Sequence, residues 1–536
     1  MGVKWRSLFI LPVIVLLFSV LGGLYGTRVQ VAAAASSSDP EQIGLSKDFD
    51  SLAKVYALVE ENYADRVSAD KAFYKGAIPG MLHTLDPHSN FFDPKEYRML
   101  LDDQKGTYYG VGMSVSTRNG KTVVIAPFPG SPAYKAGLRP GDIIFSVNDK
   151  PTENLNTTEV ADLLKGPRGT PVKVVVSREG EPDYMSFAVI RDEISRKTVP
   201  DGFWLKSDIA YLKILSFGEN THKELEENLK RLGENNIKGL VLDLRDNPGG
   251  LLNAGVAVAD HFLQKSQLIV SHHGRSSPER PYFARNGNRG RDYPIVVLVD
   301  QQSASAAEIV SGALQDHDRA WILGVRTFGK GLVQTVYPLS EGTALALTTA
   351  HFYTPSGRLI QRDYSNTSFY DYYFHKDENA QNPLDVKMTD SGRTVYGGGG
   401  IAPDEKFEYP KMDRLESQLY REGLFKFTRS YFTKHSSKLP NGWMPDEAVS
   451  NELHDYLLGA GVNFTEEEFT RDQDWIKRYL TKEMYLWAFD VDESDRVFVR
   501  TDPEVQKAID AMPKAAALVQ NAKKVMAERM SPRAGQ

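Results

Sequence analysis

The sequence predicts a multidomain α+β protein, and three observations support that prediction. First, 536 residues are too many for one hydrophobic core, so roughly two to four domains are expected. Second, apolar residues make up 41% and charged residues 25% of the chain, as in ordinary globular proteins. Third, the hydrophobic pattern changes along the chain from helical to alternating, then to strand–helix units, and finally back to helical.

Charge and cysteine content exclude several classes of protein. A net charge of -6 gives no general basic surface, so no nucleic-acid partner is expected. The chain has no cysteine, which excludes disulfides, thiolate nucleophiles, cysteine-ligated zinc and lipid attachment through a terminal cysteine. The lack of thiols fits reducing and oxidising compartments alike.

The pattern of residues 1–35 predicts an export segment. Lys4 and Arg6 precede an apolar run over residues 8–25, and small residues follow at 32–38. The run is also close to the roughly 20 residues that span a bilayer, so an anchor in the inner membrane is an equal alternative to a cleaved signal peptide. Either interpretation predicts an exported protein of the periplasm or cell envelope that contacts the membrane only through this segment.

Two domains are expected before the middle of the chain. Residues 36–103 should form a helical N-terminal domain, because their apolar residues fall on one helical stripe. Residues 104–192 should be β-rich, with one helix at 157–164. The stripe consists of Phe49, Leu52, Val55, Tyr56 and Val59, and the expected strands lie within residues 111–115, 122–126, 142–147 and 172–176.

Residues 193–404 are expected to form an α/β core. An apolar strand at 240–244 precedes a helical stripe at 251–262, and a second strand at 295–299 precedes a helical pattern at 304–314. Two strand–turn–helix units in succession predict a partly parallel sheet covered by helices.

Composition and hydrophobic pattern predict the structure of the remaining two segments. Residues from about 361 to 399 are rich in Tyr, Asp and Asn and run into four glycines, which predicts a long loop. Residues 405–536 are charged and helical in pattern, which predicts a helical C-terminal extension.

A serine-rich segment places a hydroxyl at the start of a helix. Residues 303–308 read SASAAE and lie between an apolar strand and a helix, so free amides and the positive end of the helix dipole are close by. For a serine in this setting taken alone, plain N-capping is the more usual explanation. The flanking alanines permit the close approach of another chain.

Two further segments complete a candidate hydrolase. Residues 243–250 read DLRDNPGG, and the glycine amides could hold an oxyanion, although the segment could also be a simple turn. Lys330 lies between two glycines, a setting usual for a solvated turn residue. It could act as a base only if burial kept it neutral near pH 7. The residues alone therefore support a serine hydrolase with an unusual base.

No histidine arrangement competes with this interpretation. His261, His272, His273, His317 and His351 lack metal-ligand spacing, and no GxSxG elbow is present. No metal site is therefore expected.

At this point the motifs resemble a known family, the carboxyl-terminal processing (tail-specific) peptidases. DLRDNPGG at 243–250, SASAAEI at 303–309 and TFGKGLVQ at 327–334 are similar to its three signatures, in the same order and with 25 residues from serine to lysine. LDPHS at 85–89 and GIAPD at 400–404 extend the resemblance, which spans about residues 45–404.

The resemblance implies an α/β serine protease core of the crotonase/Clp-like fold and assigns roles within it. Ser305 becomes the nucleophile, Lys330 the general base, and Gln334 the side chain that orients the lysine amine. The oxyanion would be held by amides of Ala306, Gly249 and Gly250, and Glu308 would support the site.

This chain departs from the family pattern in three places. Ala307 stands where the family often has a third serine, residues 361–399 look like an insertion, and the tail after about residue 406 is longer than a minimal member needs. The resemblance also implies that a mobile PDZ-like domain gates the site.

Residues 108–192 look like a PDZ domain. Tyr109, Gly110, Val111, Gly112 and Met113 form a glycine loop whose amides can bind a terminal carboxylate. The strand that follows can pair with an extended tail. The expected partners are therefore protein substrates with free, apolar C-termini.

Together these features predict an exported serine endopeptidase that recognises protein tails and cleaves them with a Ser–Lys dyad. No metal, nucleotide or organic cofactor is implied. One alternative is a catalytically latched tail-binding scaffold, and another is a different serine hydrolase such as an esterase. An adaptor protein and a homo-oligomer are further expected partners.

Overall fold

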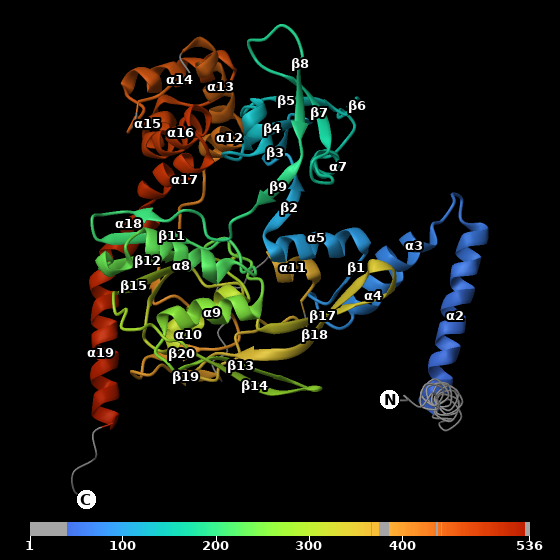
Figure 1. Cartoon of the computed structure of the whole chain (residues 1–536), viewed down its shortest axis with the longest axis vertical. Coiled ribbons are helices and arrows are strands. Elements are labelled where there is room, and N and C mark those ends of the chain that lie inside the picture. Colours follow the sequence, from blue (N-terminus) through green and yellow to red (C-terminus); the bar gives the residue numbers. More distant parts are fainter. Residues whose placement is uncertain (1–39, 366, 375–384, 436–437, 441, 531–536) are drawn as a thin grey trace, which may run out of the picture. The chain divides into compact units, whose positions relative to one another are not determined.

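The computed structural model describes residues 40–365, 367–374, 385–435, 438–440 and 442–530 (Figure 1). The predicted export segment, residues 1–35, lies outside the described residues. Among the helices that are described, none is both long and apolar enough to cross a membrane. The chain divides into two compact units, one ending at Met81 and the other beginning at Leu82.

The first unit is helical, as predicted. It holds α2 (Pro40–Asn62), α3 (Ala69–Ala72), the π-helical turn Phe73–Ala77 and most of α4 (Ile78–His83). The Tyr56 ring packs against the Phe73 ring with centroids 5.1 Å apart. Phe49, Leu52 and Val55, on the predicted stripe of α2, are exposed.

The end of the predicted N-terminal domain is not helical throughout. Asn90–Phe92 forms strand β1, which pairs antiparallel with β18 (Ala344–Tyr353) in the protease region. The helix α5 (Pro94–Lys105) follows, with Asp93 and Glu96 forming a capping box at its start. The helical prediction for residues 36–103 is therefore wrong at β1, because a three-residue strand is too short to show a period.

The predicted β-rich region forms a six-strand sheet with the predicted helix at 157–164 and a second, five-residue helix, α6. Its order is β3-β4-β5-β7-β8, with β6 paired to β5, so β3 lies at an edge. A separate ribbon, β2 paired with β9, connects this domain to the rest of the second unit (Figure 1). The elements are β2 (Thr107–Gly110), β3 (Met113–Arg118), β4 (Lys121–Pro127), α6 (Pro132–Ala136), β5 (Ile143–Val147), β6 (Lys150–Pro151), α7 (Thr157–Leu164), β7 (Pro171–Ser177), β8 (Met185–Ile190) and β9 (Asp192–Ser195).

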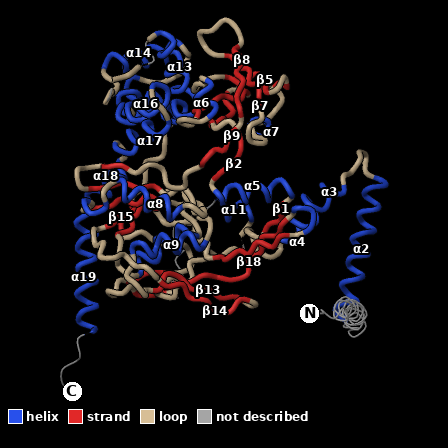
Figure 2. Tube along the Cα trace, viewed as in Figure 1, coloured by secondary structure: helices blue, strands red, loops and turns tan. Residues whose placement is uncertain are grey.

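The α/β core is built on a six-strand sheet of order β10-β11-β12-β15-β16-β21, parallel from β11 onward. Its strand β15 and the helices α8 and α9 can be followed in Figure 2. Alternate side chains of β12 face opposite layers. Leu240 and Leu242 pack under α8, α9 and α10, and Val241 packs under α18 (Pro503–Asp510) and α19 (Met512–Met530). The predicted covered parallel sheet is thus confirmed. The elements are β10 (Phe203–Trp204), β11 (Ile209–Lys213), α8 (Thr221–Arg231), β12 (Gly239–Asp243), α9 (Leu252–Phe262), β15 (Ile295–Val299), α10 (Ala306–Asp316), β16 (Trp321–Gly324) and β21 (Glu405–Lys406).

A second sheet of the core carries the loop of Lys330. Its order is β1-β18-β13-β14, and β17 also pairs with β18. The additional strands are β13 (Leu268–Gly274), β14 (Ser277–Phe283) and β17 (Leu332–Pro338).

The predicted long loop at 361–399 contains regular structure. Its described residues form α11 (Phe369–Phe374) and a hairpin of β19 (Val386–Met388) and β20 (Thr394–Tyr396). The loop prediction is wrong for these elements, which are too short to produce a hydrophobic period.

The C-terminal extension is helical, as predicted. A first group of helices shares its own core and contacts the β-rich domain, where Arg429 pairs with Glu179 and Trp487 lies against Gly141. The last two helices cover the parallel sheet. The elements are α12 (Arg414–Gln418), the π-helical turn Leu419–Gly423, α13 (Leu424–Lys434), α14 (Glu447–Gly459), α15 (Glu466–Arg471), α16 (Gln473–Ala488), α17 (Val491–Arg500), α18 (Pro503–Asp510) and α19 (Met512–Met530).

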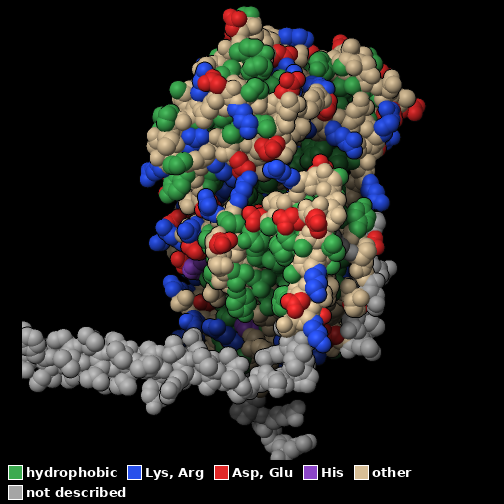
Figure 3. All heavy atoms as spheres, turned by 90° about the vertical axis from the view of Figure 1, so that its right-hand side faces the viewer, with side chains coloured by type: hydrophobic (Ala, Val, Ile, Leu, Met, Phe, Trp, Pro, Cys, Tyr) green, Lys and Arg blue, Asp and Glu red, His purple; other side chains and the backbone are tan. Residues whose placement is uncertain are grey.

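Apolar side chains also reach the surface. Figure 3 shows hydrophobic side chains gathered near the middle of one face, with acidic and basic side chains around them. Surfaces of this kind often contact other molecules.

Candidate active site

Ser305 occupies the sharp turn between β15 and α10, at the N-cap of the helix. Its backbone has φ 53° and ψ -112°, a conformation that costs energy in any residue other than glycine. Such strain is concentrated at functional sites, where the surrounding structure holds it in place. The side chain is half-buried, with the buried alanines Ala304 and Ala306 on either side.

Glu308 joins the turn that contains Ser305 (the serine turn) to the loop that contains Lys330 (the lysine loop). Its carboxylate is fully buried and accepts the main-chain N–H groups of Ser305 at 2.8 Å, Gly329 at 2.7 Å and Lys330 at 2.9 Å. It also accepts the Thr327 hydroxyl at 2.5 Å. Burial raises the pKa of Glu308, while these hydrogen bonds act in the opposite direction. The carboxylate therefore organises both halves of the predicted dyad.

The lysine loop is fixed at other points too. The Phe328 N–H donates to the Ser303 carbonyl at 2.9 Å, directly linking the two motifs. The Thr327 hydroxyl oxygen accepts the Ile401 N–H at 2.7 Å. The segment that resembles the closing GIAPD motif thus supports the loop.

The Lys330 amine is aimed at one amide side chain. Nζ donates to Gln334 Oε1 at 2.8 Å, and Gln334 Nε2 donates to the His88 carbonyl at 2.5 Å. A register shift between Val333 and Gln334 interrupts the pairing of β17 with β18, and such bulges redirect side chains. Burial lowers the pKa of Lys330, although Asp86 and Glu308 oppose the shift. The amine is therefore easier to deprotonate than an ordinary lysine.

Three aromatic side chains, His88, Tyr372 and Tyr373, form an aromatic wall beside the Lys330 amine. His88 Nε2 lies 2.9 Å from the Tyr372 hydroxyl, and His88 Nδ1 lies 3.2 Å from the Tyr373 hydroxyl. Burial, with a further contribution from Lys330, lowers the pKa of His88 to about 3, so the ring is neutral at pH 7.

The LDPHS segment is held by its own aspartate. Asp86 accepts the main-chain N–H groups of His88 and Ser89 at 2.7 Å each, and the Ser89 hydroxyl also at 2.7 Å. Burial raises the pKa of Asp86, but hydrogen bonds from Ser89 and His88 outweigh it, and the net shift is downward. The aspartate thus fixes the carbonyl that anchors Gln334.

The Pro-Gly-Gly turn lies against the serine. A Cβ atom at Gly249, where φ is 94°, would lie 2.7 Å from Ser305 Cβ, so only glycine fits. The Gly249 N–H donates to Asn247 Oδ1 at 2.8 Å, and the Asn247 carbonyl accepts the Ala304 N–H at 2.9 Å. Among the described residues, neither the Gly250 N–H nor the Ala306 N–H has a hydrogen-bond partner.

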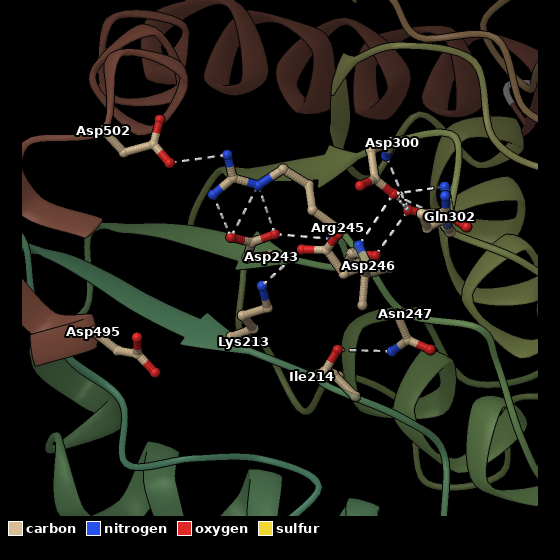
Figure 4. A network of polar contacts seen from close by, with 12 residues as sticks. Lys213, Ile214, Asp243, Arg245, Asp246, Asn247, Asp300, Gln302, Asp495 and Asp502 are labelled. Carbon is tan, nitrogen blue, oxygen red and sulfur yellow. Dashed lines mark hydrogen bonds and ion pairs between the residues drawn. The ribbon is translucent and has the colours of Figure 1, made fainter. Parts of the chain in front are cut away.

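The same turn is tied to the C-terminal extension through Arg245 (Figure 4). Arg245 Nη2 donates to Asp243 at 2.6 Å, and Nη1 donates to Asp502 at 3.0 Å and to Glu504 at 2.6 Å. Burial acts to raise the pKa of Asp243, but Arg245 and Lys213 bring it to about 2. Burial raises the pKa of Glu504 to about 7, although Arg245 opposes it. The extension is therefore part of the support for the turn.

The predicted tail-binding loop joins β2 to β3. The Val111 carbonyl accepts the Ala133 N–H at 2.8 Å, and the Gly112 carbonyl accepts the Ser131 hydroxyl at 2.7 Å. In the described part of the chain, the N–H groups of Val111 and Gly112 have no hydrogen-bond partner. Tyr109 is exposed, whereas Gly110 and Met113 are buried. Two unpartnered amides beside an edge strand suit the end of an extended peptide.

The structure thus brings Ser305, Glu308, Lys330 and Gln334 into one hydrogen-bonded cluster with Gly249 beside it, and it places residues 109–113 in a separate domain. Sequence reasoning did not single out His88, Tyr372 or Tyr373 as site residues. The LDPHS segment at 85–89, which is similar to a family motif, is the one sequence signal for His88, and no motif marks the tyrosines of the insertion.

This fold and site define a PDZ-containing serine peptidase, and the comparisons with known proteins agree. The family models "Peptidase family S41", "PDZ domain" and "Activating protease CtpB N-terminal domain" match residues 208–365, 123–178 and 23–96. The chain belongs to the carboxy-terminal-processing proteases of peptidase family S41, which confirms the predicted family.

Three relatives illustrate the similarity. The carboxy-terminal-processing protease of Bartonella bacilliformis is 36% identical over 349 residues, covering 64% of this chain and 80% of that protein. The carboxy-terminal processing protease CtpB of Bacillus subtilis is 33% identical over 340 residues, covering 62% and 70%. The carboxyl-terminal-processing protease of Synechocystis is 36% identical over 311 residues, covering 57% and 72%.

Proposed function

We propose that this protein is an exported serine endopeptidase that binds the C-terminal tails of other proteins in its PDZ domain and cleaves them with Ser305 and Lys330. The observation that carries the proposal is that the Lys330 amine is largely buried, has a lowered pKa and is held in one position. Burial lowers that pKa, and Gln334 holds the amine at 2.8 Å, as a general base requires.

The reaction begins with proton transfer. Neutral Lys330 Nζ takes the proton of Ser305 Oγ as that oxygen forms a bond to the peptide carbonyl carbon. The carbonyl oxygen gains the negative charge. The lysine, now an ammonium, gives its proton to the leaving amine as the C–N bond breaks. Water then attacks the acyl-enzyme as Lys330 takes one of its protons, and the lysine returns that proton to Ser305 Oγ as the acyl C–O bond breaks.

We assign the oxyanion to the amides of Gly250 and Ala306. Both N–H groups lack another partner among the described residues, and Ala306 begins a helix whose dipole favours negative charge. The Gly249 amide, which the family resemblance also assigns to the oxyanion, already donates to Asn247 Oδ1. Gly249 instead provides the space in which the serine turn lies.

Glu308 and Gln334 act as positioning residues. Glu308 holds the main chains of Ser305 and Lys330 on one carboxylate. Gln334 donates to the His88 carbonyl and accepts a hydrogen bond from the Lys330 amine, so the position of that carbonyl determines where the amine lies. The aromatic wall of His88, Tyr372 and Tyr373 limits the water that reaches this amine.

Substrate recognition takes place in the PDZ domain. The free N–H groups of Val111 and Gly112 bind the terminal carboxylate, and the substrate pairs along the edge of β3 as an added strand. The names of the relatives, which are carboxy-terminal processing proteases, support this assignment.

Export is inferred from the first 35 residues. Their basic start, apolar run and small residues are those of a secretory signal or of a single-span anchor. Fractionation of producing cells, with N-terminal sequencing of the mature chain, tests this. An intact N-terminus in the cytoplasmic fraction would refute it.

Cleavage of an unstructured protein with a free apolar C-terminus tests the activity. The chain from about residue 37 would be compared with Ser305→Ala, Lys330→Ala and the partly exposed control Lys387→Ala in the hairpin of β19 and β20, using free and C-terminally blocked substrate. We expect cleavage by the parent and the control only, and slower cleavage of blocked substrate. Tail binding without cleavage by the parent would favour the latched scaffold, whereas activity in Lys330→Ala would exclude lysine as the base.

A further inference from the structure

A second cluster of chemically active side chains lies between the first two turns of α8 and the last turn of α9, two helices that pack together (Figure 1). His222 and Glu226 are four residues apart on α8, and His261 lies on α9. His222 Nε2 and His261 Nδ1 each lie 3.9 Å from Glu226 Oε1.

The three residues converge on one point. A donor atom from each lies within 4.8 Å of the others, and within the described ranges no other three His, Asp or Glu side chains meet this condition. Helix positions four residues apart face the same side, so α8 presents two donors together. His261 adds a third from a different helix.

A half-buried carboxylate, that of Glu234, orients the His261 ring for metal binding. His261 Nε2 lies 3.2 Å from Glu234 Oε1, and Glu234 is itself held by Arg291 at 2.7 Å and by the Tyr293 hydroxyl at 3.3 Å. When a carboxylate accepts a hydrogen bond from one ring nitrogen of a histidine, the proton stays on that nitrogen. The other ring nitrogen then has a free lone pair that can bind a metal ion. Here that second nitrogen is Nδ1, which faces Glu226. Metal-binding histidines are usually supported in this way.

The space and the charge between the helices also suit a cation. A cavity of about 10 Å³ is lined by the three residues together with Asp260 and Arg289, which is room for one water-sized particle. Asp260 adds negative charge while its carboxylate accepts the Gly287 N–H at 2.9 Å. Two arginines oppose a cation, but Arg291 is neutralised by Glu234, and the exposed Arg289 is screened by solvent.

We propose that His222, Glu226 and His261 form a binding site for a divalent transition-metal ion of the zinc class. Two imidazoles and one carboxylate are donors that zinc prefers, with water in the fourth position. Donors on one zinc ion lie roughly 3.4 Å apart, given bonds of about 2.1 Å, so small side-chain rotations close the site.

The site lies outside the peptidase chemistry. It joins α8 to α9, and α9 begins two residues after Gly250 in the turn beside Ser305. Bound metal therefore strengthens the helical layer that supports this turn and takes no part in the reaction. The sequence did not predict it, because the three ligands are separated by 4 and then 35 residues.

Direct metal binding tests the proposal. The chain from residue 37 would be stripped with a chelator and titrated with Zn²⁺ alone by calorimetry, with metal analysis after dialysis and melting curves with and without Zn²⁺. We expect one Zn²⁺ per chain and a higher melting temperature in its presence. The absence of both effects in the parent would overturn the proposal.

Variants locate the bound ion. His222→Ala and Glu226→Gln change side chains that are not buried, so folding should be kept, and each should weaken affinity at least about 100-fold. Glu234→Gln should weaken it about 10–100-fold. The matched control His435→Ala removes a histidine 3.2 Å from Glu452 in the C-terminal helices and should bind as the parent does. Parent-like binding by His222→Ala and Glu226→Gln, or loss of binding in His435→Ala, would place the ion elsewhere.

Discussion

Ser305 and Lys330 donate their main-chain N–H groups to the same oxygen atom, Oε2 of Glu308, over 2.8 and 2.9 Å. The two residues come from different loops, yet one buried carboxylate sets the position of both backbones. A change at Glu308 should therefore disturb the proposed nucleophile and base together, which makes this residue the most sensitive support of the site.

Replacing Glu308 with Gln should reduce both stability and activity. The amide group of Gln would face N–H donors where the carboxylate now accepts them, and each buried unsatisfied donor costs about 1–3 kcal/mol. We expect unfolding free energy to fall by about 2 kcal/mol and kcat/KM to fall at least about tenfold, measured by urea unfolding and peptide cleavage. Glu467→Gln, at an exposed position in the first turn of α15, is the control. Full activity in folded Glu308→Gln would contradict its positioning role.

Gly249→Ala should inactivate the enzyme by steric contact with the serine turn. The new Cβ would lie 2.7 Å from Ser305 Cβ, in a backbone with φ 94°. Gly392→Ala is a matched control, because its φ is 90° and no atom lies within 4 Å of the added Cβ. Both variants should lose about 1–2 kcal/mol of stability from backbone strain. Gly249→Ala should lose more, because its Cβ also meets backbone atoms of Ala304 and Ala306, and it alone should lose cleavage. Equal activities would show that the contact is harmless.

Motif-bearing residues of this site could be predicted from sequence, whereas those that complete it through packing could not. Ser305, Lys330 and Gln334 lie in short segments next to strong strand and helix patterns. His88 and Tyr372 meet across 284 positions of sequence. No local pattern encodes that contact, because it depends on how β1, β17 and β18 pair.

Short elements were missed for a related reason. The three-residue strands β1, β19 and β20 show no measurable period, so the sequence suggested helix and loop there. The longer strands β12 and β15 are buried on both faces and could be recognised by their unbroken apolar runs.

The pH dependence of cleavage should report the titration of Lys330. A general base acts when neutral, so kcat/KM should rise with pH through the pKa of its amine. Because burial lowers that pKa, the rise should occur below 10.5, the ordinary lysine value. His88, whose pKa is about 3, cannot cause a rise near neutral pH. The profile should therefore keep its position in residually active His88→Asn; its disappearance would assign the titration to histidine.

Glu504 should make stability fall as pH rises toward neutral. Its pKa in the folded chain is raised from 4.5 to about 7, so the folded state binds more protons than the unfolded state between these values. The stabilisation is complete below pH 4.5 and is lost as pH passes through 7. It amounts to roughly 3 kcal/mol at most. Urea midpoints of the parent should show this slope, and Glu504→Gln should flatten it. An unchanged slope in Glu504→Gln, with Glu447→Gln as the exposed control, would assign it to another group.

Gly112→Ala should separate tail recognition from catalysis. At φ 76°, the added Cβ would lie 2.5 Å from Ser131 Cβ, so the loop that offers the Val111 and Gly112 amides must shift. Gly130→Ala shares the positive φ, at 73°, but its Cβ meets no atom within 4 Å. We expect Gly112→Ala to raise KM for a free-tailed protein at least about tenfold, since it disturbs hydrogen bonds to a charged carboxylate. Cleavage of C-terminally blocked substrate should change little, because that substrate has no carboxylate to lose. If Gly130→Ala raised KM as much, strain in the domain would explain the effect; if neither did, the carboxylate would bind elsewhere.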